Sequence, residues 1–380
     1  MADKVLSGLR IVKVSATLNS GAGRAFVLYC HALRELGADI EAWTFAPDQA
    51  MLQELADDGF PTRVLGLLKH SHRWSSSRAL ASELANSAPD VVHVHSYETG
   101  LHASRAKAAG AINQLIITHH EPRLRWSRRL FGWPHRMAPD MVTAPSPGHA
   151  RALQRWFGYP PDRVVDLTHP VLNDAFFNPP PVDEVLARDL GLTDAYPVII
   201  WVARLKKHKG QTDLIHAFRT ILEHYPSARL LIVGSGSYGR EIQRLTERLR
   251  LNEHVMLTGR RSDVPALLQL ADIFACPSHK EGFAIAIQEA MAAGKPVVST
   301  VVWGSCDHIS DGENGLLVPI GQPRALADAI LMLAADPALA KRLGEAARLY
   351  ARQHFTMERF AARLGEIYMK VLNEQKASQS

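Results

Sequence analysis

Two glutamates eight residues apart are the residues of this chain whose types and spacing most clearly suggest chemistry. Glu281 stands just before Gly282, and Glu289 lies about two turns into the short apolar helix that the following residues predict. Gly294 and Pro296 would end that helix. The first N–H groups of a helix have no partner within it and suit a phosphate. The pair therefore predicts a site for a ligand that carries both a phosphate and hydroxyl groups.

Two cations upstream would complete such a site. Arg204 and Lys209 follow a predicted strand and precede a predicted helix. A guanidinium and an ammonium at a strand end can neutralise the charge that grows on a diphosphate leaving group. A glycosidase would instead use two carboxyl groups that flank one bond. A solvated basic loop remains the alternative, because residues 206–208 are two further lysines and a histidine.

Glycine-rich turns could bring backbone close to a ligand at two places. Gly21 and Gly23 lie between a predicted strand and a helix, where N–H groups can face a ligand or where the loop simply needs tight geometry. Gly234 opens a G-x-G-x-x-G run, but a dinucleotide fold needs an acid at the end of the next strand, which here ends in Gly259 and Arg260. NAD is therefore disfavoured, NADP remains an alternative, and a turn beside another nucleotide is favoured.

Histidines end other predicted strands. His119 and His120 follow the strand at 114–118, and a strand-end histidine can donate to a developing charge or to a sugar hydroxyl, although a buried structural histidine is the alternative. His93 and His95 alternate along their strand and so share a face. No third ligand at suitable spacing accompanies them, so we expect no metal.

Residues 123–136 interleave arginines with Trp126, Phe131 and Trp133. Such a segment suits an anionic membrane surface or an anionic acceptor, and a solvated helix with an aromatic inner side is the alternative. The net charge of +5 is mild, and no nucleic-acid-binding motif is present, so we expect no nucleic-acid partner.

Short apolar strands that alternate with helical periodicity would position these residues, which indicates a parallel α/β architecture. The predicted strands are 9–15, 39–45, 90–96, 114–120, 140–146 and 163–169 in the first half, and 198–204, 228–236, 254–260, 272–278, 295–300 and 315–320 in the second. A chain of 380 residues exceeds the ~250–300 at which one core stops growing, so we expect two domains. Prolines 179–181 favour an extended spacer between them.

The sequence predicts a terminal helix with an apolar face, formed by Phe360, Leu364, Ile367, Tyr368 and Val371.

The cysteines and the N-terminus bear on the compartment. Three scattered cysteines fit a reducing compartment. The charged N-terminus lacks a signal-peptide apolar region, and no apolar run approaches ~18 residues, so we expect a cytoplasmic protein, soluble or peripheral at the inner membrane face.

These motifs, and the order in which they occur along the chain, resemble those of glycosyltransferase family 4, the retaining GT-B glycosyltransferases with an E-x7-E signature. The resemblance covers nearly the whole chain, and the glutamate block is its specific part. It rests on the glycine turn at 21–23, DVVHVH, the T-x-H of Thr118 to His120, ARLKKHKG, LLIVGSG, SHKEGFAIAIQEAMAAGKPVVST, SDGENGLLVP and the terminal helix.

The resemblance implies an α/β GT-B fold, with two Rossmann-like doubly wound domains facing each other across a cleft. It implies an acceptor-binding domain at 1–175, a linker at 176–195, a nucleotide-sugar-binding domain at 196–355 and a helix at 356–380 that packs back toward the first domain. The implied reaction moves a hexose-type sugar, with retention, from a UDP-sugar or GDP-sugar to a glycan or glycolipid acceptor. Cell-envelope polysaccharide or lipopolysaccharide synthesis is the implied setting.

The resemblance also assigns roles to residues. Arg204 and Lys209 would hold the donor diphosphate, Glu281 would touch the transferred sugar, and Glu289 would bind the ribose hydroxyls. The expected catalytic residues are His120, Arg204, Lys209 and Glu281, and the expected donor-binding residues are Gly21, Gly23, Arg204, Lys209, Gly234, Arg260, Glu281, Gly282, Phe283, Ala284 and Glu289. The donor's own phosphate would accept the proton of the acceptor, so neither a side-chain nucleophile, a cofactor nor a metal is expected.

Several segments depart from the family's usual pattern. His169 and Pro170 stand where an Asn-Gly turn is frequent, Ala284 replaces a glycine, Asp307 lies in a segment that is often Gly-Gly-x-Pro-Glu, and Met357 replaces a tryptophan. These changes leave the identity of the donor open. Two other functions remain as alternatives, namely an NADP-dependent oxidoreductase that uses the 234–239 turn and an inactive relative that binds a nucleotide-sugar or glycan without turnover.

Overall fold

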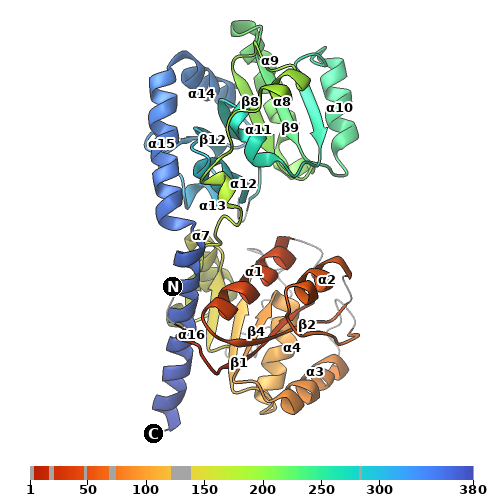
Figure 1. The fold of residues 1–380 in the computed structure, drawn as a ribbon, viewed down its shortest axis with the longest axis vertical. Helices are drawn as coiled ribbons and strands as arrows, with labels where there is room; N and C mark the ends of the chain where they lie inside the picture. The colour runs from red at the N-terminus through yellow and green to blue at the C-terminus, as the bar shows by residue number, and fades with distance from the viewer. Residues whose placement is uncertain are drawn as a thin grey trace. The chain divides into compact units, whose positions relative to one another are not determined.

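The chain divides into two compact units. The computed structural model describes residues 4–16, 21–46, 49–67, 74–120, 138–281 and 285–379. One unit comprises Met1–Pro170 together with Met357–Ser380, and the other comprises Val171–Thr356. Each unit is built around one parallel sheet (Figure 1).

The first unit carries a seven-stranded sheet in which all the paired strands are parallel. Its strands, in spatial order, are β3 (Thr62–Val64), β2 (Asp39–Thr44), β1 (Arg10–Ser15), β4 (Val91–His95), β5 (Gln114–Thr118), β6 (Met141–Ala144) and β7 (Val164–Asp166). Its helices include α1 (Gly21–Glu35), α2 (Gln49–Asp57), α3 (Trp74–Ser87), α4 (Tyr97–Ala108), α7 (Pro147–Ala152) and α16 (Met357–Gln379). The strand order reverses between β1 and β4, where a doubly wound sheet opens a crevice for ligands.

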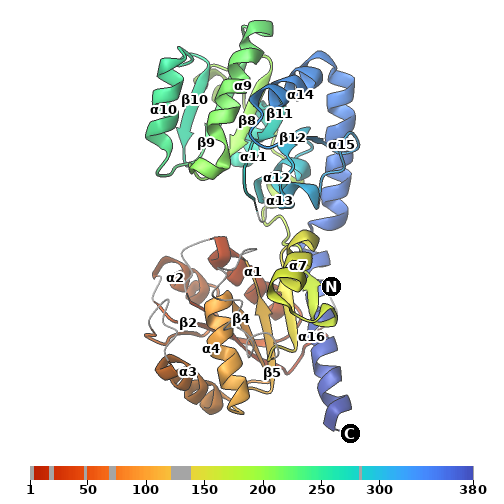
Figure 2. The same cartoon turned by 180° about the vertical axis from the view of Figure 1, so that it is seen from behind.

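Both faces of this sheet are buried, as the period of two along each strand requires. Ile11 of β1 lies in a core cluster with α1 and α16, whereas its neighbour Val12 lies in a separate cluster with α3 and α4. Figures 1 and 2 show these helices on opposite sides of the sheet. Near-continuous apolar strands are expected when helices cover both faces of a parallel sheet.

The terminal helix α16 belongs to the core of the first unit. The five residues that the sequence places on its apolar face are all buried, and they share a cluster with residues of α1. These residues are Phe360, Leu364, Ile367, Tyr368 and Val371. One of them, Tyr368, also carries a hydroxyl into the polar centre of the unit, as described below.

The second unit contains a six-stranded parallel sheet. Its strands, in spatial order, are β10 (Val255–Gly259), β9 (Arg229–Val233), β8 (Val198–Val202), β11 (Ile273–Cys276), β12 (Val297–Thr300) and β13 (Leu316–Val318). Its helices include α8 (Glu184–Asp189), α9 (Gln211–His224), α10 (Gly239–Arg248), α11 (Val264–Leu270), α12 (Ile285–Ala292), α13 (Trp303–Cys306), α14 (Pro323–Ala335) and α15 (Pro337–His354). Here the order reverses between β8 and β11.

The segment that the prolines suggested as a spacer contributes to this second core. Phe176, Phe177 and Leu192 are buried in it, and Arg348 of α15 donates to the Phe177 carbonyl oxygen at 2.6 Å. The proline run itself, residues 179–181, forms neither helix nor strand.

The predicted α/β fold, with two Rossmann-like parallel sheets, is confirmed. Each strand that the sequence predicted is present, within a few residues at its ends. The edge strand β3 was not predicted, since all three of its residues are exposed and it lacks an apolar run. Within the described residues, no helix combines the length and the apolar character that crossing a membrane requires.

Candidate active site

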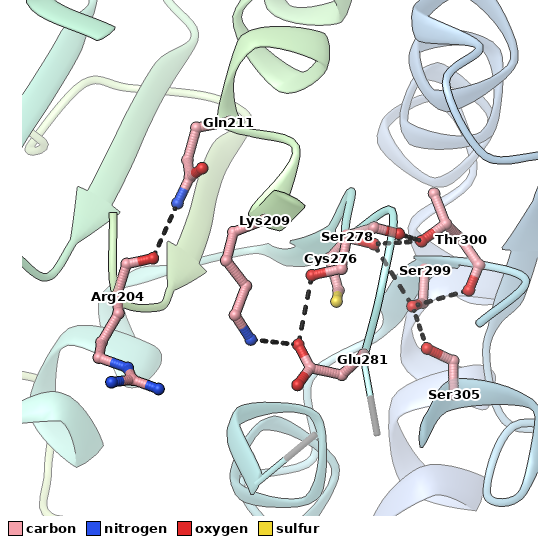
Figure 3. A network of polar contacts seen from close by, with 9 residues as sticks. All are labelled: Arg204, Lys209, Gln211, Cys276, Ser278, Glu281, Ser299, Thr300 and Ser305. Carbon is pink, nitrogen blue, oxygen red and sulfur yellow. Dashed lines mark hydrogen bonds and ion pairs between the residues drawn. The ribbon is translucent and has the colours of Figure 1, made fainter. Parts of the chain in front are cut away.

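The carboxyl ends of β8 and β11 bring two of the predicted site residues together. Lys209 ends the 3-10 turn Lys207–Lys209 after β8, and Glu281 lies in the loop after β11. The two strands are neighbours at the reversal of strand order. The Lys209 ammonium forms an ion pair with Oε2 of Glu281, and the two side chains are only 16% and 10% exposed (Figure 3). A cation and an anion from loops 72 residues apart in sequence therefore share one partly buried position.

Gly210 lets the loop that carries Lys209 pack closely against the loop that carries Glu281. Gly210, next to Lys209, has a φ of +69°, and a Cβ at that position would lie 1.9 Å from the carbonyl oxygen of Pro277. The His279 N–H donates to the His208 carbonyl oxygen at 2.9 Å, so the two loops also join through their backbones. Because backbone packs on backbone here, the loop after β8 cannot shift without moving the loop that carries Glu281.

Hydroxyl groups hold Glu281 from the other side. Ser278 donates to Oε2 of Glu281 at 3.3 Å, and Thr300, at the end of β12, donates to the Ser278 carbonyl oxygen at 2.5 Å. The Gly304 N–H, in α13, donates to the Glu281 carbonyl oxygen at 3.1 Å. Figure 3 shows the contacts of Ser278 and Thr300 in this network, together with the neighbouring Ser299–Ser305 hydroxyl pair, whose oxygens are 2.7 Å apart. The carboxylate is thus positioned by β11, β12 and α13 together.

Arg204 lies in the same loop after β8 as Lys209 and is exposed. Its carbonyl oxygen accepts a hydrogen bond from Nε2 of Gln211, the first residue of α9, at 3.3 Å. In Figure 3 its guanidinium extends to the same side as the Lys209 ammonium. Among the described residues, no carboxylate pairs with this guanidinium, so the arrangement offers cationic groups to an anion.

The glycine run after β9 is explained by the packing of loops. Gly234 has a φ of +139°, and a Cβ there would lie 1.9 Å from the Ala203 carbonyl oxygen. A Cβ on Gly236 would lie 2.3 Å from the Leu205 carbonyl oxygen. Both glycines let the β9 loop pack against the loop that carries Arg204. This requirement accounts for the pattern without a dinucleotide.

The remaining donor-site predictions lie on other elements of the two units or outside the described residues. Glu289 is half-buried on α12, and Arg260 is exposed after β10, the strand at the edge of the sheet. In the first unit, Gly21 begins α1, and Gly23 is buried within it. Gly282, Phe283 and Ala284, and the basic aromatic segment 123–136, lie outside the described residues. Their roles stay predictions, as does the membrane association.

A second polar cluster lies where β1, β4 and β5 of the first unit end. Nδ1 of His95 lies 2.9 Å from Nε2 of His120, and Nε2 of His95 lies 2.8 Å from the Lys13 ammonium nitrogen. Burial holds the pKa of both imidazoles well below the ordinary value of 6.5. The sequence predicted His120 as a site residue but gave Lys13 no role.

His93 belongs to the same cluster, and both of its ring nitrogens have hydrogen-bond partners there. Its Nε2 lies 2.7 Å from Oγ1 of Thr118, which lies 2.7 Å from Oγ1 of Thr143, and its Nδ1 lies 2.8 Å from the Tyr368 hydroxyl. Over the ranges that the structure describes, no three histidine, cysteine or acidic side chains come together as metal ligands. His119, by contrast, is buried with its Nε2 2.9 Å from the Tyr159 hydroxyl, which fits the structural alternative.

Comparisons with known proteins show the family and the fold. Residues 183–350 match the family model of glycosyl transferases group 1, and residues 19–171 match that of glycosyltransferase family 4. The D-inositol 3-phosphate glycosyltransferase of Xylanimonas cellulosilytica is 30% identical over 319 residues, which cover 81% of this chain and 73% of that protein. The chain belongs to the glycosyltransferases of family 4. The GT-B fold is shared with HepE of Anabaena, solved in complex with UDP, at a TM-score of 0.82 and 20% identity over 95% of this chain and 100% of that one.

Other relatives of this family 4 glycosyltransferase match over shorter lengths. The N-acetyl-alpha-D-glucosaminyl L-malate synthase of Bacillus anthracis is 30% identical over 191 residues, which cover 50% of each chain. The chain thus spans about half the length of that curated relative. Membership of the family sets aside the oxidoreductase alternative, in agreement with the packing role of Gly234 and Gly236.

Sequence reasoning missed the residues that support the predicted ones. Ser278, which donates to the Glu281 carboxylate, and Thr300, which donates to the Ser278 carbonyl oxygen, lie at the ends of ordinary strands and carry no distinctive spacing. Lys13 could have been noticed, because a lysine inside an apolar run that reads as a central strand is unusual. Tyr368 was assigned to an apolar helix face, and nothing in the sequence distinguishes its hydroxyl from the other residues of that face.

Proposed function

We propose that this chain is a retaining glycosyltransferase that moves a hexose-type sugar from a UDP-sugar or GDP-sugar to a glycan or glycolipid acceptor of the cell envelope. The observation that carries the proposal is the Lys209–Glu281 ion pair beside Arg204, at the strand reversal of the second sheet. A diphosphate needs cations, and a sugar needs a hydrogen-bond acceptor beside them. The UDP bound by the structural neighbour HepE supports a nucleoside diphosphate as the group recognised.

In this proposal the cations act on the leaving group. Arg204 and Lys209 neutralise the negative charge that develops on the diphosphate as the bond to the sugar breaks. Lys209 is held by Glu281, so its ammonium is positioned before the donor arrives, and little reorganisation accompanies the reaction. Glu281 accepts hydrogen bonds from hydroxyls of the sugar, and Glu289 accepts them from the ribose. No side-chain nucleophile is required, because the departing phosphate takes the proton of the acceptor.

His120 of the first unit has a separate role. Burial keeps the pKa of its imidazole well below 6.5, so the ring is neutral at physiological pH. A neutral imidazole has one nitrogen that donates and one that accepts a hydrogen bond. We assign it to the transferred sugar, where it stabilises developing charge without adding a full positive charge.

Donor binding tests this assignment. Titration calorimetry with UDP-, GDP- and ADP-sugars and with NADP identifies the ligand class, and hydrolysis of the donors then fixes base and sugar together. We expect Arg204→Ala and Glu289→Ala each to weaken donor binding by at least tenfold, because each removes one group that holds the donor.

The matched controls are Arg240→Ala and Glu241→Ala, which remove exposed charges of α10 in the same unit. Both should bind the donor as the unmodified protein does. Unchanged affinity in the Arg204 and Glu289 variants would refute their placement in the donor site. Binding of NADP alone would overturn the transferase proposal.

A further inference from the structure

Lys13 is buried without a counter-charge. It lies inside β1, is fully inaccessible, and pairs with no carboxylate among the residues that the structure describes. Its ammonium nitrogen lies 2.8 Å from Nε2 of His95 and 3.5 Å from Nδ1 of His93, and 4.7 Å from the centre of the Tyr29 ring. An unpaired buried cation is costly, and an apolar residue would fit a central strand better. The presence of a lysine at this position is therefore best explained by what its hydrogen bonds do.

Those bonds fix the hydrogens of a chain of side chains that ends at His120. A charged lysine can only donate, so Nε2 of His95 accepts from it. A neutral His95 then carries its hydrogen on Nδ1 and donates it to Nε2 of His120 at 2.9 Å. His120 in turn carries its own hydrogen on Nδ1. A charged Lys13 thus gives His120 a donating Nδ1.

A neutral Lys13 allows the chain to reverse. Its amine has a lone pair that can accept from an Nε2–H of His95. Nδ1 of His95 then accepts from an Nε2–H of His120, and Nδ1 of His120 becomes an acceptor. The hydrogens balance, because Lys13 passes one to His95, His95 passes one to His120, and His120 releases one from Nδ1. One proton leaves at the far end of the chain, and no imidazole becomes charged.

The branch through His93 keeps the other side of Lys13 fixed. The Tyr368 hydroxyl of α16 lies 2.8 Å from Nδ1 of His93, and burial raises its pKa well above 10, so it keeps its hydrogen in both states of Lys13 and can donate it to Nδ1. With Nδ1 accepting, Nε2–H of His93 donates to Thr118 at 2.7 Å. The one lone pair of His93 Nδ1 is then taken by the Tyr368 hydroxyl, so the longer contact with Lys13, at 3.5 Å, need not change between the two states. The contact between Lys13 and His95, at 2.8 Å, is the one whose direction changes.

We propose that Lys13 is a positioning residue that sets, through His95, which nitrogen of His120 carries the hydrogen. His120 then presents a donor when Lys13 is charged and an acceptor when Lys13 is neutral. The proposal rests on the role proposed above for His120 only in its consequence for the reaction. The chain of hydrogen bonds stands on its own.

The groups that face Lys13 leave it as the one that titrates near neutrality. Burial lowers the pKa of Lys13 to about 7, with Cys30 opposing the shift. The other titratable groups around it are His93 and His95 of β4, His120 after β5, Tyr29 and Cys30 of α1, Tyr368 of α16, and His169. Burial raises the pKa of Tyr29 and of Cys30 to about 12, and it lowers the pKa of every histidine in this set. All of them are uncharged at pH 7.

Nitrogen NMR of the full chain with labelled histidine tests the relay without any substrate. The His120 signals, assigned by their loss in His120→Gln, should change from the Nδ1–H form to the Nε2–H form with a midpoint near pH 7. Lys13→Met should hold His120 in one form from pH 6 to 8. His95→Gln, which keeps Lys13 but interrupts the chain, should also abolish the change. If His120 of the unmodified protein keeps one form over this range, the proposal is wrong.

Lys107→Met is the matched control, since it removes a lysine that pairs with Asp140 in the same unit but lies outside the relay. It should retain the change near pH 7, whereas loss of the change in this variant would contradict the proposal. In a transfer assay, Lys13→Met should flatten the dependence of kcat on pH and leave KM for the donor within twofold. If no nucleotide-sugar binds in the donor screen, the proposed function is wrong, whereas the NMR test of the relay is unaffected.

Discussion

At the scale of residues, the Lys209–Glu281 pair combines the most evidence. Its two members were predicted from separate motifs, and the structure joins them in one ion pair with little exposure. A charge that is nearly buried is costly once its partner is removed. The pair should therefore matter for the stability of the second unit as well as for the donor.

A double-mutant cycle measures that coupling. Lys209→Met should lower the free energy of unfolding by about 2–4 kcal/mol, because it leaves the Glu281 carboxylate with a single hydroxyl donor from Ser278. Adding Glu281→Gln should restore part of this loss, since the double variant has no buried charge at the position. Denaturant unfolding of the four proteins gives the coupling energy. Additive losses would show that the two side chains do not stabilise each other.

Some of these residues could be predicted from the sequence, and others could not. Glu281 was predictable because it belongs to a specific motif, and Lys209 because it follows a predicted strand and precedes a predicted helix, where a cation can meet a diphosphate. Lys13, His95 and His120 were not predictable as a chain, because their contact depends on the register of three strands, which pairs Lys13 with His93 and His95 with Thr118. Hydrogen-bond partners across a sheet cannot be derived from spacing along the chain.

At the scale of elements, the loop after β8 depends on one glycine. Gly210→Ala should cost at least 2 kcal/mol of stability and most of the donor affinity, because its Cβ would meet the Pro277 carbonyl oxygen at 1.9 Å and displace Lys209. Gly191→Ala is the matched control, with a φ of +62° and nothing within 4 Å of its Cβ. The control should lose only about 1 kcal/mol, by thermal melting, and keep donor binding. Equal losses in both variants would mean that the strained φ, and not the contact, matters.

Strands and helices were predictable because their patterns are strong. Buried parallel strands appear as apolar runs, and those predicted here were found. The exposed strand β3 has no such run and forms only because it pairs with β2. The role of Gly234 was also beyond the sequence, since a glycine fingerprint is the same whether the close neighbour is a phosphate or, as here, the Ala203 carbonyl oxygen.

At the scale of the whole molecule, buried histidines in both units couple folding to pH. Burial lowers the pKa of His169, in the first unit, and of His308, in the second, from 6.5 to about 4. Between these values the unfolded chain binds a proton that the folded chain does not. Stability is therefore present above pH 6.5 and is lost as the pH falls toward 4. Lys13, with its pKa lowered to about 7, adds stability as the pH rises from 7 toward 10.5 by the same reasoning.

We therefore expect the free energy of unfolding to fall by about 3 kcal/mol for each of these two histidines between pH 6.5 and 4. His169→Asn and His308→Asn should each make the dependence on pH shallower by close to one proton, even where the substitution lowers stability at neutral pH. His224→Asn, at the exposed end of α9, is the control and should keep the dependence of the unmodified protein. Denaturant titrations at half-unit pH steps measure the slope of the free energy of unfolding against pH. If that slope is unchanged in both buried-histidine variants, other groups cause the acid sensitivity. If the stability of the unmodified protein is constant down to pH 4, protonation of these histidines is not coupled to folding.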